Sequence, residues 1–324
     1  MECLSGLLRR SSFGYDGRIG LMGMNFSLRK ILIISITLVF LAFPGSVKAE
    51  QLTVFVVNYP LQYFAERIGG GHIKVVFPAP AGIDPAYWMP DVKTISDYQK
   101  ADLILLNGAG YTRWVNKVTL PRFMMVNTSA GFKDRYIEAA EILTHSHGSE
   151  GEHAHESLAF TTWIDFSLAV RQAKAIEEAL SRKRPDLRGS FQKNYAALEQ
   201  DLMMLDESIK QVVSKDRIEP LVVSHPVYDY FARRYGLNIK SVHWEPDKTP
   251  ANEEVMAFNG ILKEHPAKWM IWEGKPMPGS VDRLQAIGVG SLVFDPCGNT
   301  PDQGDFLSVM RQNVENLKPA FKKD

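Results

Sequence analysis

The sequence predicts an α/β protein of two lobes, each a mostly parallel sheet flanked by helices, joined by one long helix. Short β-rich runs alternate with helical stretches on both sides of residues 185–215, the order typical of parallel sheets. Residues 185–215 themselves have the apolar spacing of a single helix. A chain of 324 residues is longer than a single hydrophobic core usually supports, which favours two lobes.

The long helix is predicted from apolar residues that recur at steps of four and three, which place them on one helical face. About 30 residues of helix would be about 45 Å long, enough to run beside both lobes. Pro185 favours a first helical turn. We therefore predict an N-terminal lobe at 50–184, a linking helix at 185–216 and a C-terminal lobe at 217–324. The apolar face comprises Phe191, Tyr195, Leu198, Leu202, Leu205, Ile209 and Val212.

Residues 1–49 are predicted to be a secretory signal. The uncharged run ILIISITLVFLAF follows Arg29 and Lys30 and precedes small residues before Glu50. Thirteen apolar residues are few for a membrane span, so we expect cleavage after Ala49 rather than an uncleaved anchor. Translation from Met24 is a further hypothesis, because the preceding segment supplies nothing that a signal needs. No cysteine follows the apolar run, so we expect no lipid anchor.

The charge and cysteine content of the predicted mature chain argue against nucleic-acid binding and against an internal disulfide. The whole chain has 37 basic and 37 acidic residues, and residues 1–49 carry six of the former and two of the latter. The mature chain thus has a net charge of about −4, which does not favour nucleic-acid binding. Cys3 leaves with the signal, so Cys297 remains without a partner for an internal disulfide.

The N-terminal lobe alternates strands and helices. Asp91 favours a helix start, the glycines at 69–71 favour a helix end, and four prolines make 78–90 a loop. We expect strands at 52–58, 72–77, 101–106 and 123–126, and helices at 60–68, 91–100 and 166–184.

The C-terminal lobe repeats this alternation and places polar residues at strand ends. We expect strands at 221–224, 239–244, 269–273 and 291–295, and helices at 226–235, 252–264 and 280–286. The carboxyl ends of parallel strands face the ligand crevice in open α/β sheets. His225 follows the first of these strands, and Glu273 and Asp295 end two others.

A histidine-rich segment at 145–156, HSHGSEGEHAHE, lies near the end of the N-terminal lobe. Imidazoles and carboxylates bind borderline divalent metals, and closely spaced histidines can chelate. The interleaved Gly and Ser predict a flexible loop, whose ordering around an ion would cost entropy. We therefore predict weak auxiliary metal capture here; the alternative is a solvated loop with incidental histidines. Its histidines are His145, His147, His153 and His155.

Taken in order, the chain resembles the zinc and manganese substrate-binding proteins of ABC transporters, the ZnuA and TroA type. The resemblance is carried by GIDPAYWMPDVKTISDYQKADLILLNG, the histidine-rich loop, AFTTWID, the long helix, SHPVYDYFARRYGL, WEGKPMPGSVDRL and LVFDPCGN. It implies two α/β lobes joined by a rigid helix, with one metal in the cleft between them. In such proteins three histidines and one carboxylate hold the metal.

This ligand set is only half present. The resemblance places two ligands at His225 and Asp295, but the other two positions hold Ala86 and Thr161. A methyl group cannot bind a metal, and a hydroxyl is a poor zinc ligand. Glu273, Cys297 or a histidine of the loop could complete the set. We predict a metal site of His225, Asp295 and Glu273, in a cleft lined by Trp88, Trp163, Thr161 and Cys297.

The resemblance implies an extracytoplasmic receptor that binds a divalent metal and delivers it to an ABC permease. We expect zinc as cargo, with manganese as the other candidate, a periplasmic location and a monomer. No His-Glu-x-x-His or Gly-x-Ser-x-Gly motif occurs, so we expect no enzyme. An alternative is a related receptor whose cleft holds a metal chelate or an organic ligand, which the aromatic residues beside the two substitutions would favour.

Overall fold

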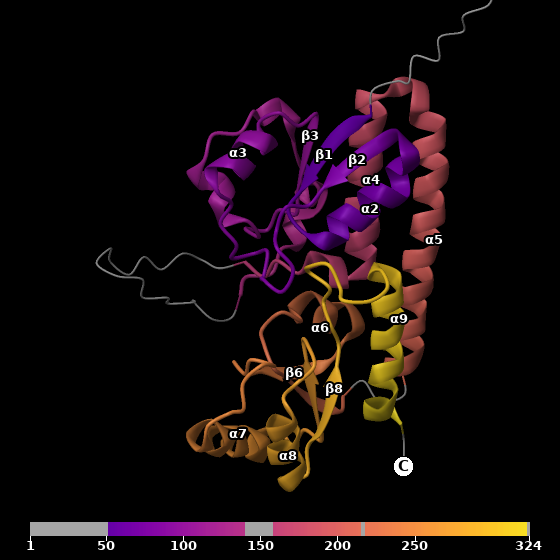
Figure 1. Ribbon diagram of the computed structural model, residues 1–324. Helices are drawn as coiled ribbons and strands as arrows, with labels where there is room; N and C mark the ends of the chain where they lie inside the picture. The colour runs from indigo at the N-terminus through magenta and orange to yellow at the C-terminus, as the bar shows by residue number, and fades with distance from the viewer. Residues whose placement is uncertain (1–50, 140–157, 215–217, 323–324) are drawn as a thin grey trace, which may run out of the picture. The chain divides into compact units, whose positions relative to one another are not determined.

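The computed structural model describes residues 51–139, 158–214 and 218–322. The predicted signal at 1–49 and the histidine-rich segment at 145–156 lie outside the described residues. Two four-stranded parallel sheets are present, as the sequence predicts, and each has its own helices (Figure 1). The described part thus has the predicted two-lobed α/β class.

The sheet of the N-terminal lobe has the strand order β2-β1-β3-β4, with every neighbouring pair parallel. The central strands β1 and β3 are mostly buried, as expected for strands covered on both faces. The strands are shorter than predicted, and β4 begins after a 3₁₀ turn rather than at Phe123. Their bounds are Leu52–Val56 (β1), Ile73–Val76 (β2), Leu103–Leu106 (β3) and Met125–Asn127 (β4).

Side-chain caps fix where the helices of this lobe begin. Asn58 accepts a hydrogen bond from the Leu61 N–H, Asp91 from Thr94, and Asp165 from Ser167 and Leu168. Each cap satisfies amide groups that the first helical turn leaves without partners. The helices are α2 (Tyr59–Gly69), α3 (Val92–Tyr98) and α4 (Phe166–Lys183).

The sheet of the C-terminal lobe has the order β6-β5-β7-β8, again all parallel. Helix α6 begins at Asp229 instead of the predicted 226, because the Val227 N–H bonds to the His225 carbonyl and forms a tight turn. The elements are β5 (Pro220–Val223), α6 (Asp229–Tyr235), β6 (Asn238–Ser241), α7 (Asn252–Glu264), β7 (Trp269–Trp272), α8 (Pro278–Ala286) and β8 (Gly290–Val293).

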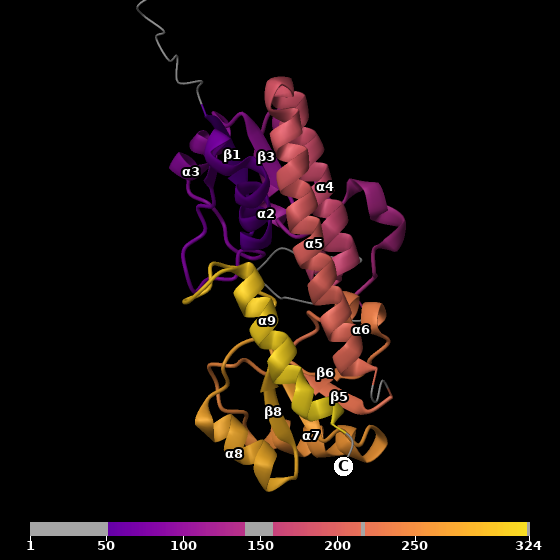
Figure 2. The same ribbon diagram turned by 90° about the vertical axis from the view of Figure 1, so that its right-hand side faces the viewer.

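The long helix α5 spans Arg188–Val213, 26 residues, and so measures about 39 Å. It is shorter than predicted because Pro185 opens a separate 3₁₀ turn, Pro185–Leu187. It contacts α2 and α4 of the first lobe and α6 of the second, and Figure 2 shows it running beside both sheets. Its predicted apolar face is buried except at half-buried Tyr195.

One helix was not predicted. α9, Phe306–Leu317, follows the last strand and packs against α5 (Figure 2). Asp305 caps it by accepting a hydrogen bond from the Ser308 N–H. The remaining short 3₁₀ helices are Gly70–His72, Arg113–Lys117, Arg122–Met124, Ala130–Arg135, Thr162–Ile164 and Lys318–Phe321.

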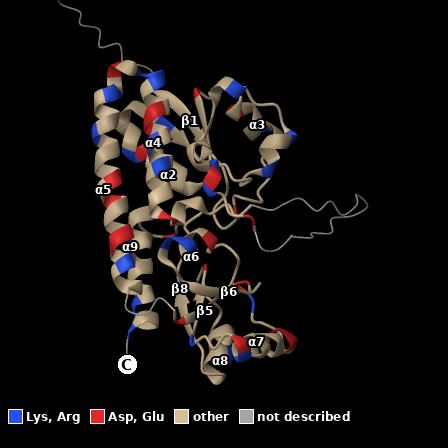
Figure 3. Ribbon diagram, turned by 180° about the vertical axis from the view of Figure 1, so that it is seen from behind, with Lys and Arg blue, Asp and Glu red and all other residues tan. Residues whose placement is uncertain are grey.

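The surface helices carry charges of both signs, and Figure 3 shows acidic and basic residues interspersed along α4 and α5. Among the described helices, none combines the length and the apolar character that crossing a membrane requires.

Candidate metal centre

The C-terminal lobe brings one histidine and two glutamates together beyond its sheet. His225 follows β5, Glu245 follows β6 and Glu273 follows β7, and these three strands are neighbours. One ligand atom from each side chain lies within 4.8 Å of the others. The strand-end position predicted for His225 and Glu273 thus places them next to each other.

The ring of His225 lies between the two carboxylates. Its Nε2 is 3.5 Å from Glu245 Oε1, and its Nδ1 is 3.1 Å from Glu273 Oε1. Nδ1 is buried, yet within the described residues no hydrogen bond of acceptable geometry reaches it. Burial opposes protonation of the ring, but the two nearby carboxylates outweigh this effect and raise the pKa of His225.

Glu245 is absent from the predicted site. It is about half exposed and lies on the loop after β6, beside His243, whose ring centroid is 5.6 Å from that of His225. The sequence contains the signal that would have found it. The strand predicted at 239–244 ends just before Glu245, so the rule that selected His225 and Glu273 also selects Glu245.

A cavity of about 270 Å³ lies between the lobes beside this cluster. Both lobes contribute carboxylates to its wall, from Asp84 on one side and from Glu273 and Asp295 on the other. Its volume is several times the about 30 Å³ that one water occupies in the liquid. It is lined by Gly82, Ile83, Asp84, Pro85, Tyr111, Phe160, Thr161, Trp163, Val227, Glu273, Asp295, Pro296, Gly298 and Asn299.

Two aspartates of the wall, Asp84 and Asp295, have pKa values above that of a free aspartate. Burial against the cavity wall and the negative charge of Glu273 raise the pKa of Asp84, although the residue as a whole is exposed. Burial and Glu273 likewise raise the pKa of Asp295, against the opposing effect of the Cys297 N–H that bonds to its Oδ1 at 2.6 Å. A bound cation would relieve this mutual repulsion.

The two positions where the resemblance expects histidine serve other roles here. The Thr161 hydroxyl donates a short hydrogen bond to the Val227 carbonyl and so joins the two lobes. Ala86 is buried, and its N–H bonds to Asp84 Oδ1 at 2.8 Å. Trp163 also bridges the lobes, because its Nε1 donates to the Pro296 carbonyl at 2.7 Å.

Two residues predicted to line the cleft do not do so. Trp88 lies half-buried in the turn after Asp84 and is not part of the cavity wall. Cys297 is buried, and its thiol faces the Asn299 carbonyl at 3.9 Å rather than the cavity. Burial raises the pKa of this thiol well above its ordinary value, which disfavours the thiolate that binds metals.

Two α/β lobes that share one long helix and line one cavity define a two-lobed α/β architecture. The chain belongs to the ZnuA family, described as the periplasmic component A of the zinc-uptake complex, whose family model matches residues 54–320. The resemblance stated from the sequence is thereby confirmed. The expectation that the protein is no enzyme agrees with the descriptions of its relatives, which name zinc binding and zinc uptake.

Curated relatives match most of the chain at low identity. The zinc-binding lipoprotein AdcA of Streptococcus pneumoniae is 25% identical over 302 residues, covering 89% of this chain and 60% of AdcA. The high-affinity zinc uptake system protein ZnuA of Bacillus subtilis is 26% identical over 294 residues, covering 85% of this chain and 89% of that protein. The chain thus spans only about three fifths of AdcA's length.

Solved structures agree on the fold. Zinc-bound AdcA of Streptococcus pneumoniae superposes with a TM-score of 0.72 at 20% identity, covering 85% of this chain and 59% of AdcA. The metal-dependent lipoprotein YcdH of Bacillus subtilis gives a TM-score of 0.71 at 22% identity, covering 83% and 99% respectively. At such identities the likeness establishes the two-lobed architecture.

Proposed function

We propose that the chain is the extracytoplasmic receptor of an ABC importer and binds a divalent metal ion, zinc above all, between its lobes. Family membership supports a place in a zinc-uptake complex, and the relatives AdcA and ZnuA are named for zinc. A periplasmic location, action as a monomer and delivery to a membrane permease are parts of this proposal. The cargo is bound and released without chemical change.

The observation that carries the proposal is the convergence of His225 with carboxylates at the inter-lobe cavity. Imidazole and carboxylate groups are common ligands of zinc in proteins. Glu273 lies 3.1 Å from His225, and Asp84 and Asp295 line the same cavity. This concentration of negative charge attracts a cation. His225, Glu273 and Asp295 are the ligands that we predict from the sequence.

Zinc titration of the metal-stripped protein by calorimetry tests the proposal, beside a variant that lacks residues 145–156. We expect one tight site per chain that survives the deletion, and weak additional binding that disappears with the segment. His225→Ala should weaken the tight site and leave the weak binding unchanged. Zinc binding that vanishes entirely with residues 145–156 would contradict the proposal.

A second candidate function is the binding of a metal chelate or an organic ligand in the cavity. It is favoured by the cavity's size and by its aromatic wall, which includes Tyr111, Phe160 and Trp163. The edge-to-face pairs of Tyr111 with Phe160 and with Trp163 form a rigid apolar surface. Calorimetry distinguishes the two functions, because a chelate receptor would bind bare zinc weakly and a zinc complex tightly.

A further inference from the structure

Every side chain of the cluster around His225 belongs to the C-terminal lobe. The histidine and both glutamates stand on the loops that follow β5, β6 and β7. The ligand set implied by the resemblance draws instead on both lobes, and its two positions in the N-terminal lobe are here Ala86 and Thr161. The first lacks any donor atom, and the hydroxyl of the second is bonded to the Val227 carbonyl.

We propose that His225, Glu245 and Glu273 form a three-ligand divalent-metal site carried by the C-terminal lobe alone. The proposal rests on the function proposed above and specifies where the metal is held. It adds Glu245 as a ligand and assigns Asp295 to the wall of the cavity.

The three side chains are close enough for one ligand atom of each to share an ion. One such atom from each lies within 4.8 Å of the others. Ligands at about 2.1 Å from a tetrahedral metal lie about 3.4 Å from one another, so small side-chain rotations would bring these atoms around one ion. The present contacts use both ring nitrogens, Nε2 with Glu245 and Nδ1 with Glu273. An imidazole binds an ion through one nitrogen, so a bound ion would replace one of these contacts. Nδ1 is buried, and its contact with Glu273 lacks the geometry of a hydrogen bond.

Asp295 is less well placed to be a ligand. Its Oδ1 accepts the Cys297 N–H, and its backbone N–H and carbonyl both bond to the Asn313 side chain. It does not belong to the group whose ligand atoms lie within 4.8 Å of one another. These hydrogen bonds hold Asp295 in the loop after β8, and they account for its orientation without a metal.

Three protein ligands leave coordination positions open, as in sites where water or a substrate completes the shell. Glu273 also lines the cavity, so these positions face a space that holds several waters or a small oxygen-donor chelator. Asp84 from the other lobe faces the same space and is near enough to Glu273 for the two charges to interact. The N-terminal lobe therefore covers the ion and need not bind it directly.

The test is zinc affinity of the full chain, measured by competition with a chromophoric chelator strong enough to outcompete weak sites. We expect Glu245→Gln and Glu273→Gln each to weaken zinc binding by about tenfold or more, the scale of lost metal-site groups. Asp247→Asn is the matched control, because it removes one negative charge from the same exposed loop. It should leave the affinity unchanged within about twofold.

A second readout is independent of affinity. The visible spectrum of the cobalt(II)-substituted chain reports the ligands directly, and it should change in Glu245→Gln and stay the same in Asp247→Asn. Glu245 is about half exposed, so its amide variant should fold normally, which circular dichroism checks.

The outcomes separate this inference from the proposed function. Parent-like affinity and spectrum in Glu245→Gln, with zinc binding lost in Asp295→Asn, would overturn the C-terminal triad and leave the receptor function intact. Absence of any tight zinc or cobalt site in the parent chain would overturn both. Loss in Glu245→Gln and retention in Asp295→Asn would support the triad.

Discussion

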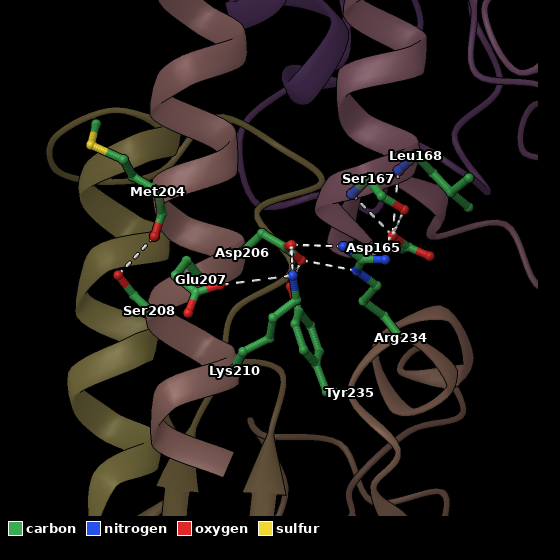
Figure 4. Close-up of polar contacts among 10 residues, drawn as sticks. All are labelled: Asp165, Ser167, Leu168, Met204, Asp206, Glu207, Ser208, Lys210, Arg234 and Tyr235. Atoms are coloured by element: carbon green, nitrogen blue, oxygen red, sulfur yellow. Dashed lines mark hydrogen bonds and ion pairs between the residues drawn. The ribbon is translucent and has the colours of Figure 1, made fainter. Parts of the chain in front are cut away.

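Arg234 donates two parallel hydrogen bonds to Asp206, from Nε to Oδ1 at 2.9 Å and from Nη2 to Oδ2 at 2.7 Å (Figure 4). Asp206 lies on α5 and is fully buried, whereas Arg234 lies on α6. The same guanidinium is 3.6 Å from Asp165, the cap of α4. One side chain of the C-terminal lobe thus joins the long helix and the first lobe, nine residues after His225.

Arg234→Gln should destabilise the protein by about 2 to 3 kcal/mol, because hydrogen bonds to charged groups contribute on this scale when buried. Lys210 and Tyr235, at 2.6 and 3.0 Å from Asp206, would retain part of the stabilisation. Urea unfolding followed by circular dichroism measures the change.

Arg184→Gln is the matched control. Arg184 makes a similar pair of hydrogen bonds to Asp186, but Asp186 is exposed and only two residues away in the chain. We expect no resolvable change, since exposed ion pairs contribute little. Equal losses in the two variants would show that the buried junction has no special role.

The buried carboxylate also predicts how stability depends on pH. Burial opposes ionisation of Asp206, but Arg234 and Lys210 outweigh it and lower the pKa. A carboxylate in the unfolded chain takes up a proton near pH 3.9, before the folded one does. The stabilisation is therefore full above that pH and is lost as the pH falls through the lower folded pKa.

Unfolding free energies of the parent and of Asp206→Asn, measured from about pH 5 down to about pH 2, should converge as the pH falls. A difference in unfolding free energy between the two proteins that stays constant over this range would mean that the pKa of Asp206 is not lower in the folded state. Asp186→Asn, at the exposed pair, should run parallel to the parent throughout.

The fold was largely predictable because its signals are local. The steps of four and three from Phe191 to Val212 predict α5, and short apolar runs predict the strands. Helix α9 was missed although Asp305 caps it, because no helix or strand was predicted beyond Asp295. Element ends were less accurate, as at α6, where the turn at residues 225–227 replaces the predicted first helical turn.

The site was only partly predictable, because it depends on how strands far apart in the chain become neighbours. Strand ends indicated His225 and Glu273, which the structure brings to 3.1 Å. Glu245 was overlooked, although it follows a predicted strand in the same way. The hydrogen bond from Thr161 to Val227 joins the two lobes, and nothing in the local sequence indicates it.

Leu202→Ala should test whether α5 depends on its buried face. Leu202 is fully buried in the main core, and removal of such a side chain costs about 2 to 5 kcal/mol. Met203→Ala is the control on the same helix, because its side chain is 42% exposed. Its cost should be about 0.5 kcal/mol or less. Equal losses in urea unfolding would contradict a helix held by one apolar face.

Restoring histidine at the two substituted positions tests why the cavity differs from the ligand set implied by the resemblance. The double variant Ala86→His and Thr161→His should bind zinc about tenfold more tightly or better, since two further imidazoles can complete a four-ligand site. Thr161→Val is the control, because it removes the hydrogen bond to Val227 without adding a ligand. Competition with a chromophoric chelator measures the zinc affinity of the double variant and of the control. Glu245→Gln should lower zinc affinity less in the double variant than in the parent. If the added histidines leave zinc affinity at the parent level while the protein stays folded, the N-terminal wall of the cavity does not approach the bound ion, and the metal is held by the C-terminal lobe alone.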